Sequence, residues 1–217
     1  MNNEVFTEEW FSGSGTFSKV ARDFGYYTVT IDNNPKCAPH ICKDVRDIKL
    51  WNGRDIFWAS PPCTGFSVAS ISHHWTGGKS AYIPKSETVK LGIELLEYTI
   101  KSIAESKPRK WFIENPRGIM RKIIDKIFLK YGVTDYKRVT VCLCRVGDTR
   151  MRPTDIWCND DSWYDERLMM CHNGFDDHER APRGSKTGTQ GLKNAYERGK
   201  LPEGLFKAIF NGLRSRQ

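Results

Sequence analysis

The chain has 217 residues, with 34 lysines and arginines against 26 aspartates and glutamates, so its net charge is +8. Hydrophobic residues make up 39% of it, which is enough for a packed core and excludes a chain that is disordered throughout. No hydrophobic run reaches the ~20 residues of a membrane helix, and the N-terminal residues lack a secretion-signal pattern. Seven cysteines, an odd number, therefore predict reduced thiols in a cytoplasmic protein with no membrane partner.

Short hydrophobic runs alternate with helix-like stretches over the first 157 residues. Hydrophobic residues three or four positions apart predict helices, and compact hydrophobic runs predict strands. A strand is also expected to end before Asp44. Strands that alternate with helices predict an α/β fold with a mostly parallel, doubly wound sheet. In chain order, we expect strands at 6–11, 27–31, 55–59, 110–113, 136–143 and 155–157, and helices at 17–24, 89–103 and 119–129.

Ligands of such sheets bind beyond the carboxyl ends of the strands, so the residues that follow each strand are the candidates. Residues 11–17 (FSGSGTF) join the first strand to a helix, and their two glycines allow a tight turn and a close approach to a ligand. Asp32 ends the second strand, where a carboxylate can accept hydrogen bonds from ribose hydroxyls. Asp44 is placed to accept from an adenine amino group. Together they predict a bound adenosine derivative.

The fourth predicted strand leads into residues 60–67 (SPPCTGFS), which contain a candidate nucleophile. Pro61 and Pro62 stiffen the turn and fix the direction of Cys63. A thiolate is a strong nucleophile even when it is only partly ionised near neutral pH. The alternative, a small buried cysteine, is the usual role of the other six. The rigid loop at the end of the strand favours a catalytic role for Cys63.

A candidate acid ends the next strand, in residues 112–118 (FIENPRG). Glu114 should face the same crevice as Cys63, and a glutamate in an apolar site can hold a proton near neutral pH. The alternative is a glutamate that caps the following helix. Arg150 and Arg152 are two positions apart, and on a strand they would point to the same face. We expect them to hold a base carbonyl and a phosphate.

The ordered set of these motifs resembles the S-adenosylmethionine-dependent cytosine-C5 DNA methyltransferases, over about residues 5–157. The resemblance implies a Rossmann-like methyltransferase fold. It also implies that Cys63 attacks C6 of a cytosine, that Glu114 protonates or hydrogen-bonds N3, and that Arg152 helps to hold the ring. Residues 71–85 would be a mobile loop that closes over the base. The residues implied for S-adenosylmethionine are Phe11, Ser12, Gly13, Gly15, Thr16, Asp32, Asn33, Asp44, Val45, Ser60 and Pro61.

The substrate implied is DNA, either a duplex from which the cytosine is flipped out or a single strand. Residues 1–157 are predicted to form the catalytic and cofactor-binding domain, and residues 158–185 a small insert in place of the family's target-recognition domain. Residues 186–217 would be a basic segment whose terminal helix packs back on the catalytic domain. Compact phage-borne relatives resemble the chain most, which implies a bacterial or phage-infected host cytosol. We expect a short target sequence or a requirement for a second subunit.

Other interpretations remain open from the sequence. The same chemistry could act on RNA cytosine. Residues 60–62 (SPP) also fit the start of the motif of amino-methyltransferases that act on adenine N6 or cytosine N4, although Cys63 replaces its aromatic residue. A non-catalytic relative that only binds nucleic acid is the third alternative. Cysteines and histidines at 142, 144, 158, 171, 172 and 178 suggest zinc, but their spacing fits no standard finger, so we expect buried thiols and no metal.

Overall fold

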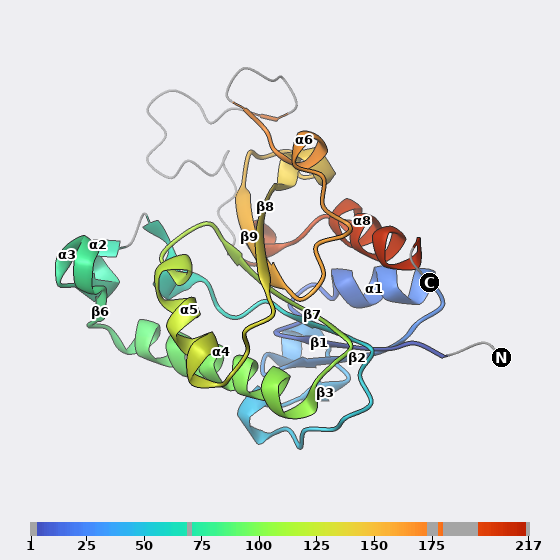
Figure 1. Ribbon diagram of the computed structural model, residues 1–217, viewed down its shortest axis with the longest axis horizontal. Coiled ribbons are helices and arrows are strands. Elements are labelled where there is room, and N and C mark those ends of the chain that lie inside the picture. The colour runs from blue at the N-terminus through green and yellow to red at the C-terminus, as the bar shows by residue number, and fades with distance from the viewer. Residues whose placement is uncertain (1–3, 69–70, 173–177, 180–194, 216–217) are drawn as a thin grey trace.

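Figure 1 shows the computed structural model, which describes residues 4–68, 71–172, 178–179 and 195–215. A seven-stranded sheet runs through its centre, in the order β3-β2-β1-β4-β7-β9-β8. The strands are β1 (Phe6–Trp10), β2 (Tyr27–Asp32), β3 (Ile41–Cys42), β4 (Ile56–Ala59), β7 (Lys110–Pro116), β8 (Lys137–Cys142) and β9 (Pro153–Cys158).

The pairing of the strands confirms the predicted mostly parallel α/β sheet. β1 pairs in parallel with β2 on one side and β4 on the other, β2 pairs in parallel with β3, and β4 pairs in parallel with β7. Only β9 runs against its neighbours, because it pairs antiparallel with both β7 and β8. The carboxyl ends of β1, β2, β4 and β7 therefore share one edge, where such sheets bind ligands.

Helices cover both faces of the sheet. The helices α4 (Glu87–Ser106) and α5 (Met120–Lys130) pack on one face, and α1 (Thr16–Asp23) and α8 (Glu203–Arg214) pack on the other. Alternate strand residues supply the two cores, as the strand period of two requires. On β4, Phe57 belongs to the first core and Trp58 to the second, where Trp58 stacks on Phe17 of α1 with ring centroids 5.7 Å apart.

Local signals set the ends of the longest helix. Ser86 caps α4 because its side chain accepts a hydrogen bond from the backbone N–H of Val89, and the left-handed Lys107 ends the helix. Shorter helical turns connect the remaining elements. They are η1 (Pro35–Cys37), η2 (Val45–Asp47), η3 (Thr64–Phe66), η5 (Leu143–Val146), α6 (Glu166–Met169) and α7 (Ala195–Gly199).

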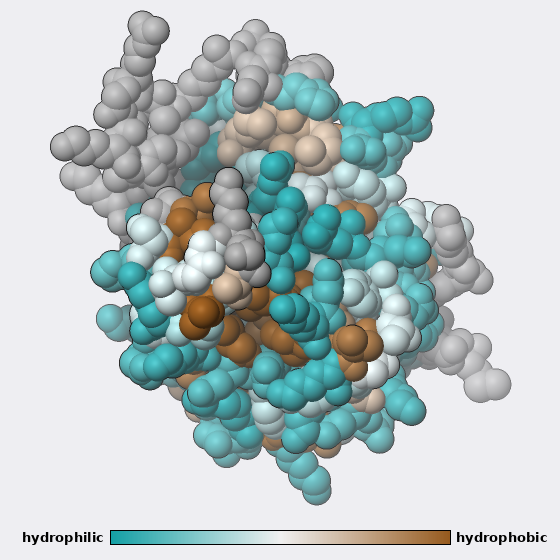
Figure 2. All heavy atoms as spheres, turned by 60° about the vertical axis from the view of Figure 1, so that its left-hand side comes forward, coloured by the Kyte–Doolittle hydropathy of each residue, from teal (hydrophilic) through white to brown (hydrophobic). Residues whose placement is uncertain are grey.

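Residues 71–85, expected as a mobile loop, are folded. They form α2 (Ile71–His74), β5 (Trp75–Thr76), α3 (Gly78–Ala81) and β6 (Ile83–Pro84), and the two strands pair antiparallel. The face that brings α2 and α3 forward shows hydrophobic side chains among hydrophilic ones (Figure 2). Val68 and Ile83, at the two ends of this region, are 60% and 51% exposed. Apolar surface thus lies beside the loop that contains Cys63.

One expected element is wrong. Arg150 and Arg152 do not lie on a strand, because β9 begins only at Pro153 and Arg150 makes an isolated bridge with Glu179. Their alternating spacing therefore does not come from a pleated backbone. Among the described residues, no helix is both long and hydrophobic enough to cross a bilayer.

Candidate active site

A cavity of about 900 Å³ opens beyond the carboxyl ends of β1, β2, β4 and β7. It brings together most of the residues that the sequence singles out. Twelve of the fifteen line it directly: Phe11, Ser12, Gly13, Thr16, Asp32, Asn33, Ser60, Pro61, Cys63, Glu114, Arg150 and Arg152. Asp44 and Val45 line a second cavity of about 50 Å³, which shares Phe11, Asn33 and Pro62 with the first.

The glycine loop turns sharply between β1 and α1. Phe11, Gly13 and Gly15 all have positive φ angles, of 56°, 49° and 65°. This left-handed backbone is easy for glycine and strained for phenylalanine, so Phe11 is held by its surroundings. Gly15 forms the turn that begins α1 and offers no side-chain cap, but the buried Glu9 carboxyl accepts a hydrogen bond from the first-turn N–H of Ser18 at 3.1 Å. The positive end of the α1 dipole thus already has an acidic side chain of the protein beside it.

Asp32 fastens the glycine loop to the end of β2. Its two carboxylate oxygens accept hydrogen bonds from the backbone N–H of Gly13 at 2.9 Å and of Asn34 at 2.8 Å. Each oxygen can still accept another bond, because a carboxylate has about four lone-pair sites. Asp32 therefore both shapes the loop and offers acceptors to the cavity.

Asp44 is less free than the sequence suggests. It caps η2 by accepting from the N–H of Arg46, and it also forms an ion pair with the Arg46 guanidinium at 2.8 Å. These hydrogen bonds lower the pKa of Asp44 below its usual value. The carboxylate is thus charged and oriented beside the small cavity.

Glu9 is a buried acid of this site that the sequence analysis missed. It lies on β1, lines the cavity and accepts a hydrogen bond from the backbone N–H of Ser18 at 3.1 Å. Burial raises its pKa to about 7, against the opposing effect of the bonds from Ser18. The acidic pair Glu8-Glu9 in a strand was the available signal, since a charged residue on the inner face of a central strand needs a partner or a proton.

The loop after β4 holds Cys63 in a fixed position. Asn115 donates from its side-chain nitrogen to the backbone carbonyl of Pro61 at 2.8 Å, and Ile119 N–H donates to the carbonyl of Phe66 at 2.9 Å. From the other side, the Trp75 indole donates to the carbonyl of Gly65 at 2.6 Å. The loop is thus held by β7, by the start of α5 and by the 71–85 segment.

Cys63 itself is exposed on its cavity side, yet the surrounding protein desolvates its thiol. This desolvation raises the thiol pKa, and the negative charge of Glu114 raises it further. The positive charges of Arg152 and Arg198 act in the opposite direction. The thiol therefore keeps its proton at neutral pH until a change in its surroundings favours the thiolate.

Glu114 is almost fully buried at the end of β7, on the strand next to that of Cys63. Desolvation raises the pKa of its carboxyl, and the charge of Arg152 and the hydrogen bond from Thr154 oppose this effect. Thr154 donates from its hydroxyl to Glu114 at 2.8 Å. A buried, oriented carboxyl of raised pKa that lines the same cavity as a thiol suits acid-assisted nucleophilic addition.

The two arginines converge although they are not on a strand. Arg150 forms a two-pronged ion pair with Asp148, with bonds of 2.9 and 2.8 Å. Arg152 donates to the backbone carbonyl of Arg198, and at 2.6 Å to that of Lys200. Desolvation lowers the pKa of the Arg152 guanidinium, and the charge of Glu114 opposes this. Both arginines line the cavity, so their side chains point the same way, as expected, although a loop and not a strand holds them.

The C-terminal segment, in which the sequence analysis expects a helix that packs back on the catalytic domain, also supplies cavity-lining residues that the sequence analysis did not name. Tyr196, Arg198, Gly199 and Lys200 of α7 and its exit line the cavity, as does Phe206 of α8. Phe206 also packs edge-on against Trp58, with ring centroids 4.9 Å apart. This part of the cavity wall depends on contacts between residues 148 positions apart, for which a single sequence contains no local signal.

Comparison with known proteins gives one close sequence relative. The chain is 31% identical over 155 residues to a protein of Frog virus 3 (isolate Goorha) that is assigned as a DNA (cytosine-5)-methyltransferase. The match covers 68% of this chain and 67% of the viral protein. No family model matches the sequence.

Two solved structures resemble the fold. A protein from an E. coli prophage, assigned as a DNA modification methyltransferase, has a TM-score of 0.52 at 16% identity, covering 71% of this chain and 46% of its own. A methyltransferase of Entamoeba histolytica has a TM-score of 0.51 at 16% identity, covering 76% and 56%. The chain thus spans about half the length of these two proteins. At such identities the likeness shows a shared methyltransferase fold.

Proposed function

The chain belongs to the DNA (cytosine-5)-methyltransferase family, and from this premise we propose that it methylates C5 of cytosine in DNA through a covalent adduct with Cys63. One observation supports this most. Cys63 lies in the loop after β4, and the buried Glu114 lies near the end of the adjacent parallel strand β7; both line one cavity, and the charge of Glu114 raises the pKa of Cys63. A nucleophile beside an acid of raised pKa suits addition to an aromatic ring that must accept a proton as it is attacked.

Each residue has a defined task in this mechanism. The Cys63 thiolate forms a bond to C6 of the cytosine, and the electron pair of the C5–C6 double bond moves into the ring. Glu114 donates its proton to N3, which neutralises the ring and leaves C5 electron-rich. After C5 gains the methyl group, a solvent water takes the C5 proton, the C5–C6 double bond re-forms, the C6–S bond breaks and N3 returns its proton to Glu114. The thiolate is thereby released for another cycle.

Arg152 affects the pKa of both Cys63 and Glu114. Its positive charge lowers the pKa of Cys63 and of Glu114, against their desolvation. It therefore favours the thiolate needed for attack. We propose that Arg152, with Arg150 beside it, also contacts the carbonyl of the cytosine or its phosphate, because guanidinium groups bind such acceptors well.

The cavity has donors and acceptors that fit S-adenosylmethionine. We propose that Phe11 stacks on its adenine, that Asp32 and Asn33 bind its ribose hydroxyls, and that Asp44 accepts from the adenine amino group. Asn115 has a buried side-chain oxygen that lacks a partner among the described residues, and Asn115 also lines this cavity. When bound, S-adenosylmethionine supplies the electrophilic methyl group.

DNA is the proposed partner. A duplex substrate requires that the cytosine be turned out of the stack to reach a cavity of this depth, whereas a single strand does not. Residues 179–217 contain nine lysines and arginines against three glutamates, a balance of +6 that suits contacts with phosphates. We also propose that the folded 71–85 segment packs over the extruded base, since Trp75 connects it to the Cys63 loop.

The test is a methyl-transfer assay with labelled S-adenosylmethionine on duplex DNA, single-stranded DNA and RNA, followed by mass spectrometry of the nucleosides. We expect 5-methylcytosine from DNA with the wild-type chain and none with Cys63→Ser. Cys42→Ser is the matched control, because Cys42 is an exposed cysteine on β3 that does not line the cavity. Methylation at N4 of cytosine or N6 of adenine, or in RNA alone, would contradict the proposal.

Covalent trapping examines the adduct separately. A DNA strand with 5-fluorocytosine at the target position cannot lose its C5 substituent as a proton. We therefore expect a stable protein–DNA adduct with the wild type and with Cys42→Ser, and none with Cys63→Ser. Peptide mapping should locate the DNA on Cys63; an adduct on another cysteine would refute the assigned nucleophile.

A further inference from the structure

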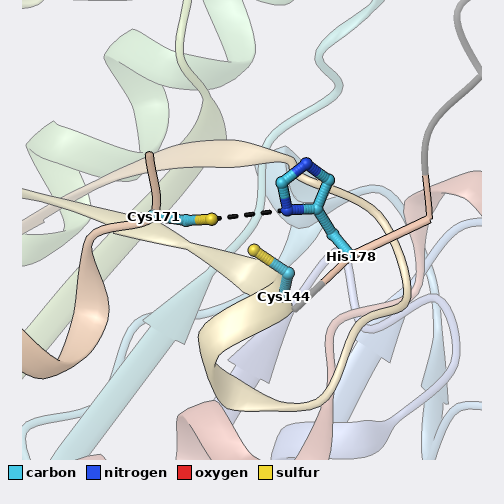
Figure 3. A group of neighbouring side chains, drawn as sticks. All are labelled: Cys144, Cys171 and His178. Atoms are coloured by element: carbon cyan, nitrogen blue, oxygen red, sulfur yellow. Dashed lines mark hydrogen bonds between the residues drawn. The ribbon is translucent and has the colours of Figure 1, made fainter. Parts of the chain in front are cut away.

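A sulfur-rich cluster lies outside the active-site cavity. Cys144 belongs to η5, Cys171 follows α6, and His178 precedes the bridge between Arg150 and Glu179. The donor atoms of these three side chains all lie within 4.8 Å of one another, and Cys171 Sγ is 3.4 Å from His178 Nδ1. Figure 3 shows the three side chains pointing toward one another from separate segments.

The two cysteines of this cluster are buried, and the histidine is partly so. Cys144 and Cys171 are only 8% and 4% exposed, and His178 is half-buried. Cys142 completes a small separate core in which every buried member is a cysteine, with Met151 and Met170 packed against it. Aliphatic and aromatic residues make up most of the other two cores of the described chain, so a core of cysteines alone is not explained by packing.

We propose that Cys144, Cys171 and His178 bind a zinc ion. Zinc binds thiolate sulfur at about 2.3 Å and imidazole nitrogen at about 2.0–2.1 Å, which places tetrahedral donors about 3.5–3.8 Å apart. The observed spacing is close to this, and the widest pair needs to approach by about 1 Å. Three protein ligands leave the fourth position to an exchangeable ligand such as water.

The donor chemistry selects the metal. Two thiolates and an imidazole suit zinc, whereas magnesium and calcium take oxygen ligands, and the cluster has no carboxylate among its donors. An iron–sulfur cluster generally needs four cysteines. The spacing of these residues along the chain predicts only buried thiols, since 27 positions separate Cys144 from Cys171 and no zinc-finger pattern spans them.

From outside the cavity, the ion would stabilise the loop that contains Arg150 and Arg152. Glu179, the residue after His178, donates its backbone N–H to the carbonyl of Thr149 at 2.7 Å. Its backbone thereby forms an isolated β-bridge with that of Arg150. Arg150 and Arg152 line the cavity, whereas the three proposed ligands do not. Zinc would therefore connect η5, the segment after α6 and the loop that presents the two arginines.

The test measures metal content. The full chain is purified from zinc-supplemented cells under reducing conditions, desalted and analysed by inductively coupled plasma mass spectrometry. We expect about one zinc ion per chain, and at least about a tenfold lower content in Cys144→Ser, Cys171→Ser and His178→Ala. Cys158→Ser is the matched control, because Cys158 is equally buried but lies on β9 in a different core, and it should keep its zinc.

A second measurement does not depend on the variants folding. Demetallated wild-type chain is titrated with Co²⁺, which should produce the near-ultraviolet charge-transfer absorption of thiolate-bound cobalt and the visible bands of a tetrahedral ion. A wild type that binds neither zinc nor cobalt in this way overturns the proposal. So does zinc that persists in all three ligand variants, or a Cys144–Cys171 disulfide in chain purified without reductant.

Discussion

The side chain of Asn115 donates a hydrogen bond to the backbone carbonyl of Pro61 at 2.8 Å, within the protein interior. This bond joins the strand that positions Glu114 to the loop that positions Cys63. Asn115 therefore sets the relative position of the nucleophile and the acid, although it is neither. Small errors in such a position are costly, since catalysis depends on reacting groups being held in line.

Asn115→Ala should lower kcat for methyl transfer by about ten- to a hundredfold. It leaves the buried Pro61 carbonyl without its partner, so the free energy of unfolding should also fall by about 1–3 kcal/mol. Asn159→Ala is the matched control, because Asn159 makes equivalent bonds with Trp111 and Arg109 at the other end of β7. If both variants lose stability and activity to the same extent, Asn115 has only a structural role.

Glu114→Gln should reduce the rate of 5-methylcytosine formation by roughly two to four orders of magnitude, because the amide retains hydrogen bonding but has no proton to give. Burial raises the pKa of Glu114, so the wild-type acid stays protonated at a higher pH than an exposed glutamate. The decline in rate as pH rises through this pKa should be absent from the variant. Glu94→Gln, which changes an exposed residue of α4, is the control.

Arg152→Gln should raise the pKa of the Cys63 thiol, because the charge of Arg152 lowers it in the wild type. At a fixed pH near 8, iodoacetamide should therefore alkylate Cys63 more slowly in the variant. Arg150→Gln is the control: Arg150 contacts the same carbonyl of Arg198 but does not contribute to the Cys63 shift. The rate is read by mass spectrometry of the Cys63 peptide. An equal slowing in both variants would mean that loop geometry, rather than charge, controls the thiol.

Glu9→Gln should make the ligand-free protein more stable at neutral and alkaline pH. The pKa of Glu9 in the folded protein, about 7, lies above its ordinary value of 4.5, so the stability that its protonated carboxyl contributes is fully present below pH 4.5 and is lost as the pH rises to 7. The loss amounts to about 3 kcal/mol. The neutral glutamine avoids this loss and can still accept from Ser18. Urea unfolding at several pH values measures it. A wild type and a variant with parallel pH dependence would show that Glu9 is not the group responsible.

Much of the fold and the centre of the site follow from local patterns. The run at 55–59 predicts β4 because buried parallel strands are short and hydrophobic throughout, and the two prolines after it mark Cys63 as rigidly held. Glu114 is identifiable because an acid directly follows the hydrophobic residues Trp111 to Ile113. These predictions need only neighbours in the sequence.

The remainder depends on contacts between distant residues. Thr154 orients Glu114 from 40 positions away, and α7 supplies its carbonyls to Arg152 from more than 40 positions away. The interpretation of Arg150 and Arg152 as strand residues is wrong. Two side chains two positions apart can also point the same way in an irregular loop, when they share the same partners. Here the shared partners are Asp148 and Arg198. Neither relationship can be read from spacing alone.

The direction of β9 has a consequence for how much change the site can tolerate. Because this strand runs against β7, its beginning lies at the catalytic edge, and Thr154 opposes Pro116 there. Moving the strand by a single residue would exchange its two faces, so the Thr154 hydroxyl would turn away from Glu114 and a neighbour without a hydroxyl would replace it. An insertion or deletion between Arg152 and Thr154 should thus abolish activity even if every side chain were retained. Changes in length after Cys158, at the opposite end of the strand, would leave this alignment intact.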